Sequence, residues 1–147
     1  MSLLLLPFTL LWVLAPAPAP PTQPSPVPLT VVVTALASTH SVVKLNFYNT
    51  AASFLEENQH ARQLVVRPGG KATLTVPVEL TPGEWAVALT QDINDNDLLD
   101  TNFLGIPTEP YAFSNNVRPR FSRPTFEQCK FTVSQPGQVI TIAMQKQ

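Results

Sequence analysis

Residues 71–91 read KATLTVPVELTPGEWAVALTQ, and this stretch decides the fold class. Apolar residues occupy every second position as far as Val78, the turn sequence TPG follows, and the alternation resumes at Trp85. Strand side chains alternate between two faces, whereas a helix repeats every 3.6 residues. The stretch therefore predicts two strands separated by a turn, each with one apolar and one polar face, as in antiparallel sheets.

The same period of two recurs on both sides of this stretch. Five more segments alternate or are rich in β-branched residues: residues 29–36, 42–47, 63–66, 126–133 and 139–144. No segment has the pattern of a long helix, although residues 51–58 are compatible with one or two helical turns. About seven short strands predict an all-β fold, an antiparallel sandwich of immunoglobulin-like or transthyretin-like type over residues 29–147 with one long ordered loop.

The composition excludes several classes of protein. The chain has 147 residues, of which 44% are hydrophobic and 13% are charged, and its net charge is −1. A nucleic-acid-binding protein normally has a strongly basic face, and a disordered chain has fewer apolar residues, so neither class fits. The single cysteine excludes an intrachain disulfide and any zinc or iron–sulfur site built from cysteines.

The N-terminal residues predict export to the periplasm, the cell envelope or the outside of the cell. Residues 3–15 read LLLLPFTLLWVLA, a run too short to cross a bilayer as a helix but suited to the apolar core of a signal peptide. We expect residues 1–19 to be a signal peptide or an uncleaved apolar segment, because prolines follow the small residues at which cleavage would occur. If it is not cleaved, this segment is the only part that we expect to contact a membrane. Residues 20–28 are rich in proline and predict a stiff linker.

One long connection, residues 92–123, interrupts the strand pattern and is the expected functional surface, because a compact domain seldom keeps so long a loop without a role. It opens with DINDNDLLD at residues 92–100, which contains all the aspartates of the chain. Calcium takes oxygen ligands at alternate positions of a tightly curled backbone. The candidate calcium ligands are Asp92, Asn94, Asn96 and Asp100, with Asn102 beside them.

A second interpretation of the same residues stays open. The position that is usually glycine in a calcium loop is Asp97, and the usual final glutamate is Phe103. Asp and Asn side chains also form turns by hydrogen-bonding to their own backbone, and such a turn needs no cation. The sequence suggests no cofactor other than calcium.

A basic cluster follows on the same connection. Arg118, Arg120 and Arg123 are three of the five arginines of the chain. An ion-pair network between these arginines and the aspartates would neutralise the loop without a metal, and an anion-binding patch is the alternative. The residues expected to brace the second half of the loop are Glu109, Tyr111, Asn115, Asn116, Arg118 and Arg120.

Residues 80–116 read LTPGEWAVALTQDINDNDLLDTNFLGIPTEPYAFSNN, which resembles the signature of the bacterial family known as domain of unknown function 2141. The likeness extends over about residues 29–145. It implies an exported protein with a sandwich fold and brings no established activity. The chain has Asp95, Asp97, Pro110 and Ala112 where the family pattern has glycines, so left-handed backbone is less accessible there.

The remaining reactive residues suggest no catalytic centre. His40 and His60 are isolated, and no nucleophile motif accompanies them. Cys129 alternates with polar residues and is expected to be a small buried hydrophobe. We therefore predict a non-catalytic binding or structural domain, whose protein or small-ligand partner the residues do not name. The alternative is a hydrolase that uses the loop carboxylates.

Overall fold

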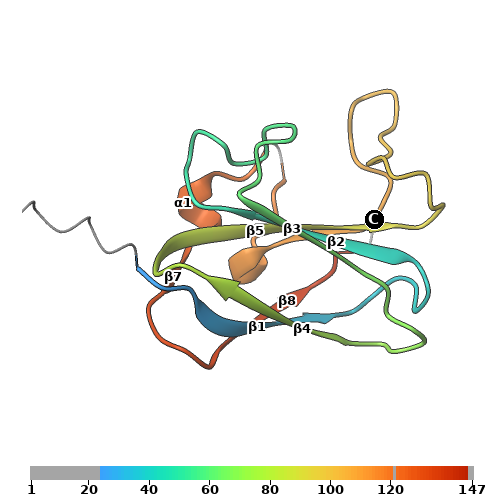
Figure 1. The fold of residues 1–147 in the computed structure, drawn as a ribbon. Helices are drawn as coiled ribbons and strands as arrows, with labels where there is room; N and C mark the ends of the chain where they lie inside the picture. Colours follow the sequence, from blue (N-terminus) through green and yellow to red (C-terminus); the bar gives the residue numbers. More distant parts are fainter. Residues whose placement is uncertain (1–23, 121, 146–147) are drawn as a thin grey trace, which may run out of the picture.

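The computed structural model describes residues 24–120 and 122–145, so the predicted signal peptide lies outside the described residues. The described chain forms eight strands in two facing sheets, which confirms the predicted all-β sandwich (Figure 1). The strands are β1 (Val27–Thr34), β2 (Val42–Tyr48), β3 (Arg62–Val66), β4 (Leu74–Leu80), β5 (Gly83–Asp92), β6 (Tyr111–Phe113), β7 (Phe131–Val133) and β8 (Gln138–Ala143). Two short helical elements, η1 (Ser114–Asn116) and α1 (Phe126–Cys129), complete the order. Within the described residues, no helix has the length and apolar composition needed to span a bilayer.

The two sheets differ in size and in strand direction. The smaller sheet has the order β4-β1-β8, and the larger has the order β3-β2-β5-β6, with β7 pairing with the start of β5. Most pairs are antiparallel, as expected, but β1 and β8 run parallel, with Val31 opposite Ile140. Parallel neighbours need a long crossover. Here the crossover is most of the chain, because the larger sheet is built between β1 and β8.

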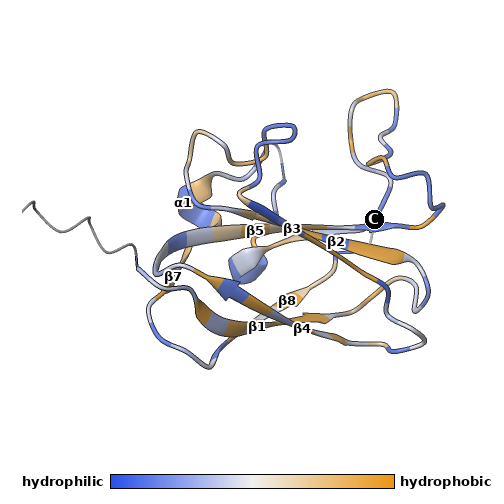
Figure 2. Ribbon diagram, viewed as in Figure 1, coloured by the Kyte–Doolittle hydropathy of each residue, from blue (hydrophilic) through white to orange (hydrophobic). Residues whose placement is uncertain are grey.

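The main core lies between the sheets and uses the predicted alternation. Val31 and Val33 of β1 are fully buried, and they face Leu45 and Val87 from the larger sheet within one apolar cluster. Trp85 joins this cluster and donates its indole N–H to the carbonyl of Thr81 at 2.9 Å. Figure 2 shows the hydrophobic colouring along the strands of both sheets.

A second apolar cluster covers the outer face of the larger sheet, which the alternation had assigned to solvent. Phe54, from the segment after β2, and Phe126, from α1, pack edge-to-face over this outer face with ring centroids 5.9 Å apart. Ala86 and Ala88 of β5 lie beneath them and are buried. The alanine positions are small enough to admit the covering aromatic rings, so β5 is buried on both faces.

Three expected boundaries differ from the structure. The segment expected to be a strand from residue 126 begins with the helical turn α1, whose Thr125 and Gln128 form a reciprocal capping box, and only residues 131–133 are strand. Residues 51–58 form hydrogen-bonded turns rather than a helix. β1 starts at Val27, within the expected linker, because proline is tolerated near the first residue of a strand.

Candidate functional site at the rim of the sandwich

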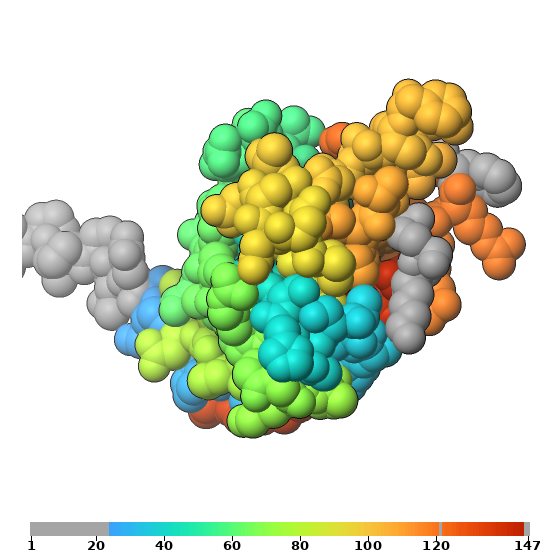
Figure 3. Space-filling view, turned by 90° about the vertical axis from the view of Figure 1, so that its right-hand side faces the viewer, coloured from blue at the N-terminus to red at the C-terminus, as the bar shows by residue number. Residues whose placement is uncertain are grey.

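The most elaborate loop of the molecule leaves the larger sheet where β5 ends. We call residues 92–109 the rim loop. It projects from the right-hand end of the sandwich in Figure 1, and its gold atoms extend beyond the body in Figure 3. The long connection expected over residues 92–123 is therefore divided, because β6 returns to pair with β5 at residues 88–90.

Asp92 organises the first turn of the rim loop from a buried position. Only 3% of the residue is exposed, and its two carboxylate oxygens accept the backbone N–H groups of Asn96 at 3.2 Å and Asp97 at 2.8 Å. Asp95 and Asp97 adopt left-handed backbone with φ of 58° and 65°. Aspartate is among the residues that tolerate this conformation. The turn thus forms despite the aspartates that stand where the family pattern has glycines.

Glu109 closes the rim loop from its other end. It is 4% exposed, and its carboxylate accepts the N–H of Ile93 at 2.8 Å and the N–H of Asp100 at 3.4 Å. Through these two contacts, a side chain at the end of the loop is connected to the beginning of the loop at Ile93 and to its middle at Asp100. A buried carboxylate is tolerated only when hydrogen bonds compensate its lost hydration, so Glu109 holds the loop in one arrangement.

The predicted calcium ligands contact one another instead of facing a common empty centre. Asp100 accepts the side-chain amides of Asn94 at 2.6 Å and of Asn96 at 3.0 Å. The amide oxygen of Asn94 accepts the N–H of Asn96, and that of Asn96 accepts the N–H of Leu98. Nitrogen donors therefore point at Asp100 in this arrangement, and calcium binding by these residues stays a prediction. Among the described residues, no three acidic, histidine or cysteine side chains lie close enough to share a metal ion.

The counter-charges of the loop come from β2 and from the residue after β3, and not from the three arginines of the long connection. Lys44 of β2 contacts Asp97 at 3.0 Å and Asp92 at 3.8 Å, and Arg67, just after β3, contacts Asp95 at 3.3 Å. The expected network between the aspartates and Arg118, Arg120 and Arg123 is absent from the described ion pairs. The reason is that β6 and η1 carry the chain away from the rim before the arginines are reached.

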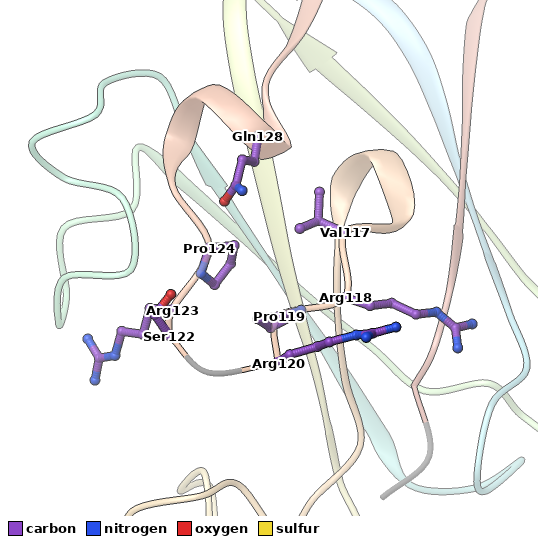
Figure 4. Close-up of a pocket in the computed structure, with 8 residues that line it drawn as sticks. All are labelled: Val117, Arg118, Pro119, Arg120, Ser122, Arg123, Pro124 and Gln128. Carbon is purple, nitrogen blue, oxygen red and sulfur yellow. The ribbon is translucent and has the colours of Figure 1, made fainter.

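The arginines instead border a shallow pocket of about 230 Å³ beside α1, together with Val117 and Gln128. Figure 4 shows that Arg118 and Arg120 extend to one side of this pocket and Arg123 to the other. Their guanidinium groups do not converge on one point, so the view gives no support to the alternative of an anion-binding patch.

Asn115 and Asn116 brace η1 rather than the rim loop. Both adopt left-handed backbone. The Asn115 amide donates to the carbonyls of Gln128 and Lys130, and Asn116 contacts Thr141 and Ala143 of β8. Tyr111 lies in β6, where its carbonyl accepts the N–H of Gln145 at 2.9 Å. These residues attach the segment after the rim loop to both sheets.

A small hairpin forms the far end of the rim loop, and we call residues 101–107 the apolar finger. The Asn102 side-chain oxygen accepts the N–H groups of Leu104 at 2.9 Å and Ile106 at 3.0 Å. Gly105 supplies a positive φ of 74° at the turn. The side chains that this turn displays point to solvent: Phe103 is 94% exposed, Leu104 is 67% exposed and Ile106 is 47% exposed.

Sequence reasoning missed the apolar finger, Lys44 and two buried polar residues. Gln91 is fully buried and holds the loop after β1 through Ala37 and Ser38, while Ser114 accepts the N–H of Val87 at 2.8 Å and donates to the carbonyl of Cys129 at 2.6 Å. The finger had a signal in the sequence NFLG, because Asn followed by Gly three residues later is typical of a tight turn. Apolar residues inside such a turn indicate an exposed tip.

These features define the class of protein. It is a two-sheet β-sandwich with a hydrogen-bonded acidic loop at its rim, and that loop displays an apolar finger. Residues 31–141 match the model of a family described as "uncharacterized protein conserved in bacteria (DUF2141)", so the chain belongs to this family, as the resemblance predicted. No curated protein and no solved structure matches the chain.

Proposed function

We propose that this protein is a non-catalytic binding domain and that the rim loop is its binding surface. The observation that carries the proposal is the different placement of charged and apolar side chains in the loop. Its carboxylates are turned onto hydrogen-bond donors and cations, while Phe103 and Leu104 are displayed to solvent. Large exposed apolar groups on a rigid support are typical of interaction sites.

The same contacts argue against the hydrolase alternative. General acid–base catalysis needs a carboxyl group that can reach a substrate proton and change its protonation state. Asp92 and Glu109 each accept two backbone N–H groups inside the loop, and Asp100 accepts two side-chain amides. These three carboxylates are engaged within the loop, which supports the non-catalytic role.

We also propose that the protein works after export, as the apolar residues 3–15 suggest. Fractionation of a bacterium that produces the full chain, followed by N-terminal sequencing of the recovered protein, tests this. We expect recovery outside the cytoplasm. Recovery in the cytoplasm alone would contradict export, and the new N-terminus distinguishes a cleaved signal from a retained apolar segment.

The binding role is tested by retention of envelope material on the immobilised full chain. The test variant is Phe103→Ser/Leu104→Ser, and the matched control is Val65→Ser/Val139→Ser, which changes two exposed apolar residues on β3 and β8. We expect the finger variant to lose retention while the control keeps it. Equal retention by both variants would show that the finger is not the binding surface.

A further inference from the structure

We propose that the apolar finger inserts into the surface of a lipid bilayer with zwitterionic headgroups. This inference rests on the proposed binding role of the rim loop and names its partner. The first observation is the display of apolar side chains at the tip. Leu98 and Leu99 are 67% and 45% exposed just before the finger, and Phe103 is almost fully exposed. Figure 2 shows hydrophobic colouring on the projecting loop.

The second observation is that four of the six backbone N–H groups in residues 101–107, all but those of Thr101 and Phe103, donate to acceptors within the finger. In an apolar phase each unpaired N–H group carries a large penalty, so these internal bonds lower the cost of insertion. The backbone N–H of Asn102 donates to the carbonyl of Ile106, and that of Gly105 donates to the carbonyl of Asn102. The N–H groups of Leu104 and Ile106 donate to the side-chain oxygen of Asn102. At the base of the finger, the N–H of Thr108 donates to the carbonyl of Asp100. Residues 101–107 also contain no charged side chain. Insertion therefore breaks none of these bonds and buries no charge.

The shape of the finger favours a fluid partner over a protein. A stable protein interface uses about 20–30 residues on each side and requires a complementary surface. The finger offers a few side chains on a convex projection (Figure 3), and a bilayer receives such a projection without a preformed pocket. The hydrogen bonds of Glu109 to Ile93 and Asp100 hold the base of the finger, so insertion does not require the loop to reorganise.

The charge at the base of the finger determines the preferred headgroup. Residues 92–109 contain five carboxylates and no Lys or Arg, and Lys44 and Arg67 are the cations that contact them in the described chain. The excess negative charge would be repelled by an anionic surface and would lie among the cationic choline groups of a zwitterionic one. The affinity for vesicles should fall as anionic lipid is added. Salt screens the repulsion, so this fall should be smaller at high salt.

The experiment uses the full chain with an environment-sensitive nitrobenzoxadiazole label at Leu104→Cys, and with the same label at Val139→Cys as control. Val139 is 61% exposed on β8 and lies outside the rim loop. Burial raises the pKa of Cys129 to about 11, so the native thiol takes little label at neutral pH. A label at a defined position reports insertion there, whatever residues 3–15 do.

On phosphatidylcholine vesicles we expect a severalfold rise and a blue shift of emission at position 104 and none at position 139. The response should fall when Phe103→Ser is added, and it should fall as phosphatidylglycerol replaces phosphatidylcholine. No response at position 104, or the same response at both positions, would overturn the inference. A rise that depends on protein concentration without vesicles would indicate a second copy as partner and would also overturn it.

The two proposals fail in distinguishable ways. If position 104 ignores vesicles but Phe103→Ser/Leu104→Ser still abolishes retention of envelope proteins, the lipid inference is wrong and the binding role stands. If neither measurement depends on the finger, both proposals are wrong.

Discussion

Glu109 shows how one side chain can hold a surface loop without a metal. Its buried carboxylate reaches N–H groups sixteen and nine residues earlier in the chain, at Ile93 and Asp100. The negative charge makes these bonds stronger than bonds between neutral groups. Asp92 does the same for the first turn, so two buried acids hold four backbone N–H groups of an acidic loop.

Replacing Glu109 by Gln should therefore destabilise the protein. The amide has one oxygen and one N–H₂ group, so one backbone donor loses its acceptor at a cost of about 1–3 kcal/mol. Urea unfolding measures this loss, and Glu56→Gln, at an exposed position, is the matched control. Equal midpoints for the two variants would mean that the Glu109 contacts contribute nothing.

Cys129 and Tyr48 predict how stability depends on alkaline pH. Burial raises the pKa of the Cys129 thiol from 9.0 to about 11, and burial also raises the pKa of Tyr48 from 10.0. In the unfolded chain both groups ionise earlier, so unfolding releases protons. The stability that these groups contribute is complete below pH 9 and is lost as the pH rises through the folded-state values.

The measurement is the urea midpoint from pH 8 to 11, a range set by these pKa values, in the wild type and in Cys129→Ala. Cys129→Ala should be less stable than the wild type at pH 8 because it leaves a cavity, and its stability should fall less steeply above pH 9. An identical slope in the two proteins would show that the thiol does not titrate on unfolding.

At the scale of elements, alternation predicted which residues form strands but not which strands are neighbours. The register of β2 and β5 places Lys44 opposite Thr90, two residues before Asp92, and this pairing supplies the counter-charge that the sequence could not locate. Likewise, the alternation could not predict that β1 and β8 are parallel, because a strand buries the same side chains whichever way it runs beside its neighbour.

The helical turn α1 was not predicted, although the sequence carries a signal for it. Thr125 and Gln128 have the capping-box spacing, while Cys129, Phe131 and Val133 share the spacing of a strand face. The cap decided the first part of the segment because its two hydrogen bonds satisfy the end of the turn. Only residues 131–133 retain the strand geometry.

Thr125→Ala should destabilise α1 and make the thiol of Cys129 more accessible to reagents. Loss of an N-terminal cap costs about 1 kcal/mol, and Cys129, the last residue of α1, would become more accessible. The rate of reaction with an aromatic disulfide reagent should rise severalfold, whereas Thr132→Ala, on an exposed position of β7, should leave it unchanged. The cap would be irrelevant if both variants reacted at the wild-type rate.

At the scale of the whole molecule, the sandwich is a rigid support that holds the rim loop at one end. The apolar alternation and the turn residues were sufficient to predict this architecture. The displayed surface was not predicted, because periodicity describes what strands bury and carries no information on a loop; the signal for the tip was the turn sequence NFLG. The aspartates made the loop the candidate surface, and their neighbours Phe103 and Leu104 form its exposed end.

Calcium should leave the stability of the whole molecule unchanged. A bound ligand raises stability by about 2.7 kcal/mol at a hundredfold excess over its dissociation constant. Because the oxygens of Asn94, Asn96 and Asp100 are already hydrogen-bonded, we expect the same melting temperature in millimolar calcium and in chelator. A clear rise of the melting temperature with calcium would contradict this prediction and favour the metal-binding interpretation of the loop.

The most direct measurement of the central claim is amide hydrogen exchange of the rim loop by NMR, first in chelator and then in excess calcium. The amides of Ile93, Asn96, Asp97 and Asp100 should be protected, because each donates to a buried carboxylate of Asp92 or Glu109. The amide of Phe103, at the exposed tip, serves as the internal reference. Exchange of the four amides at the rate of an unfolded chain, with protection only after calcium is added, would contradict the account.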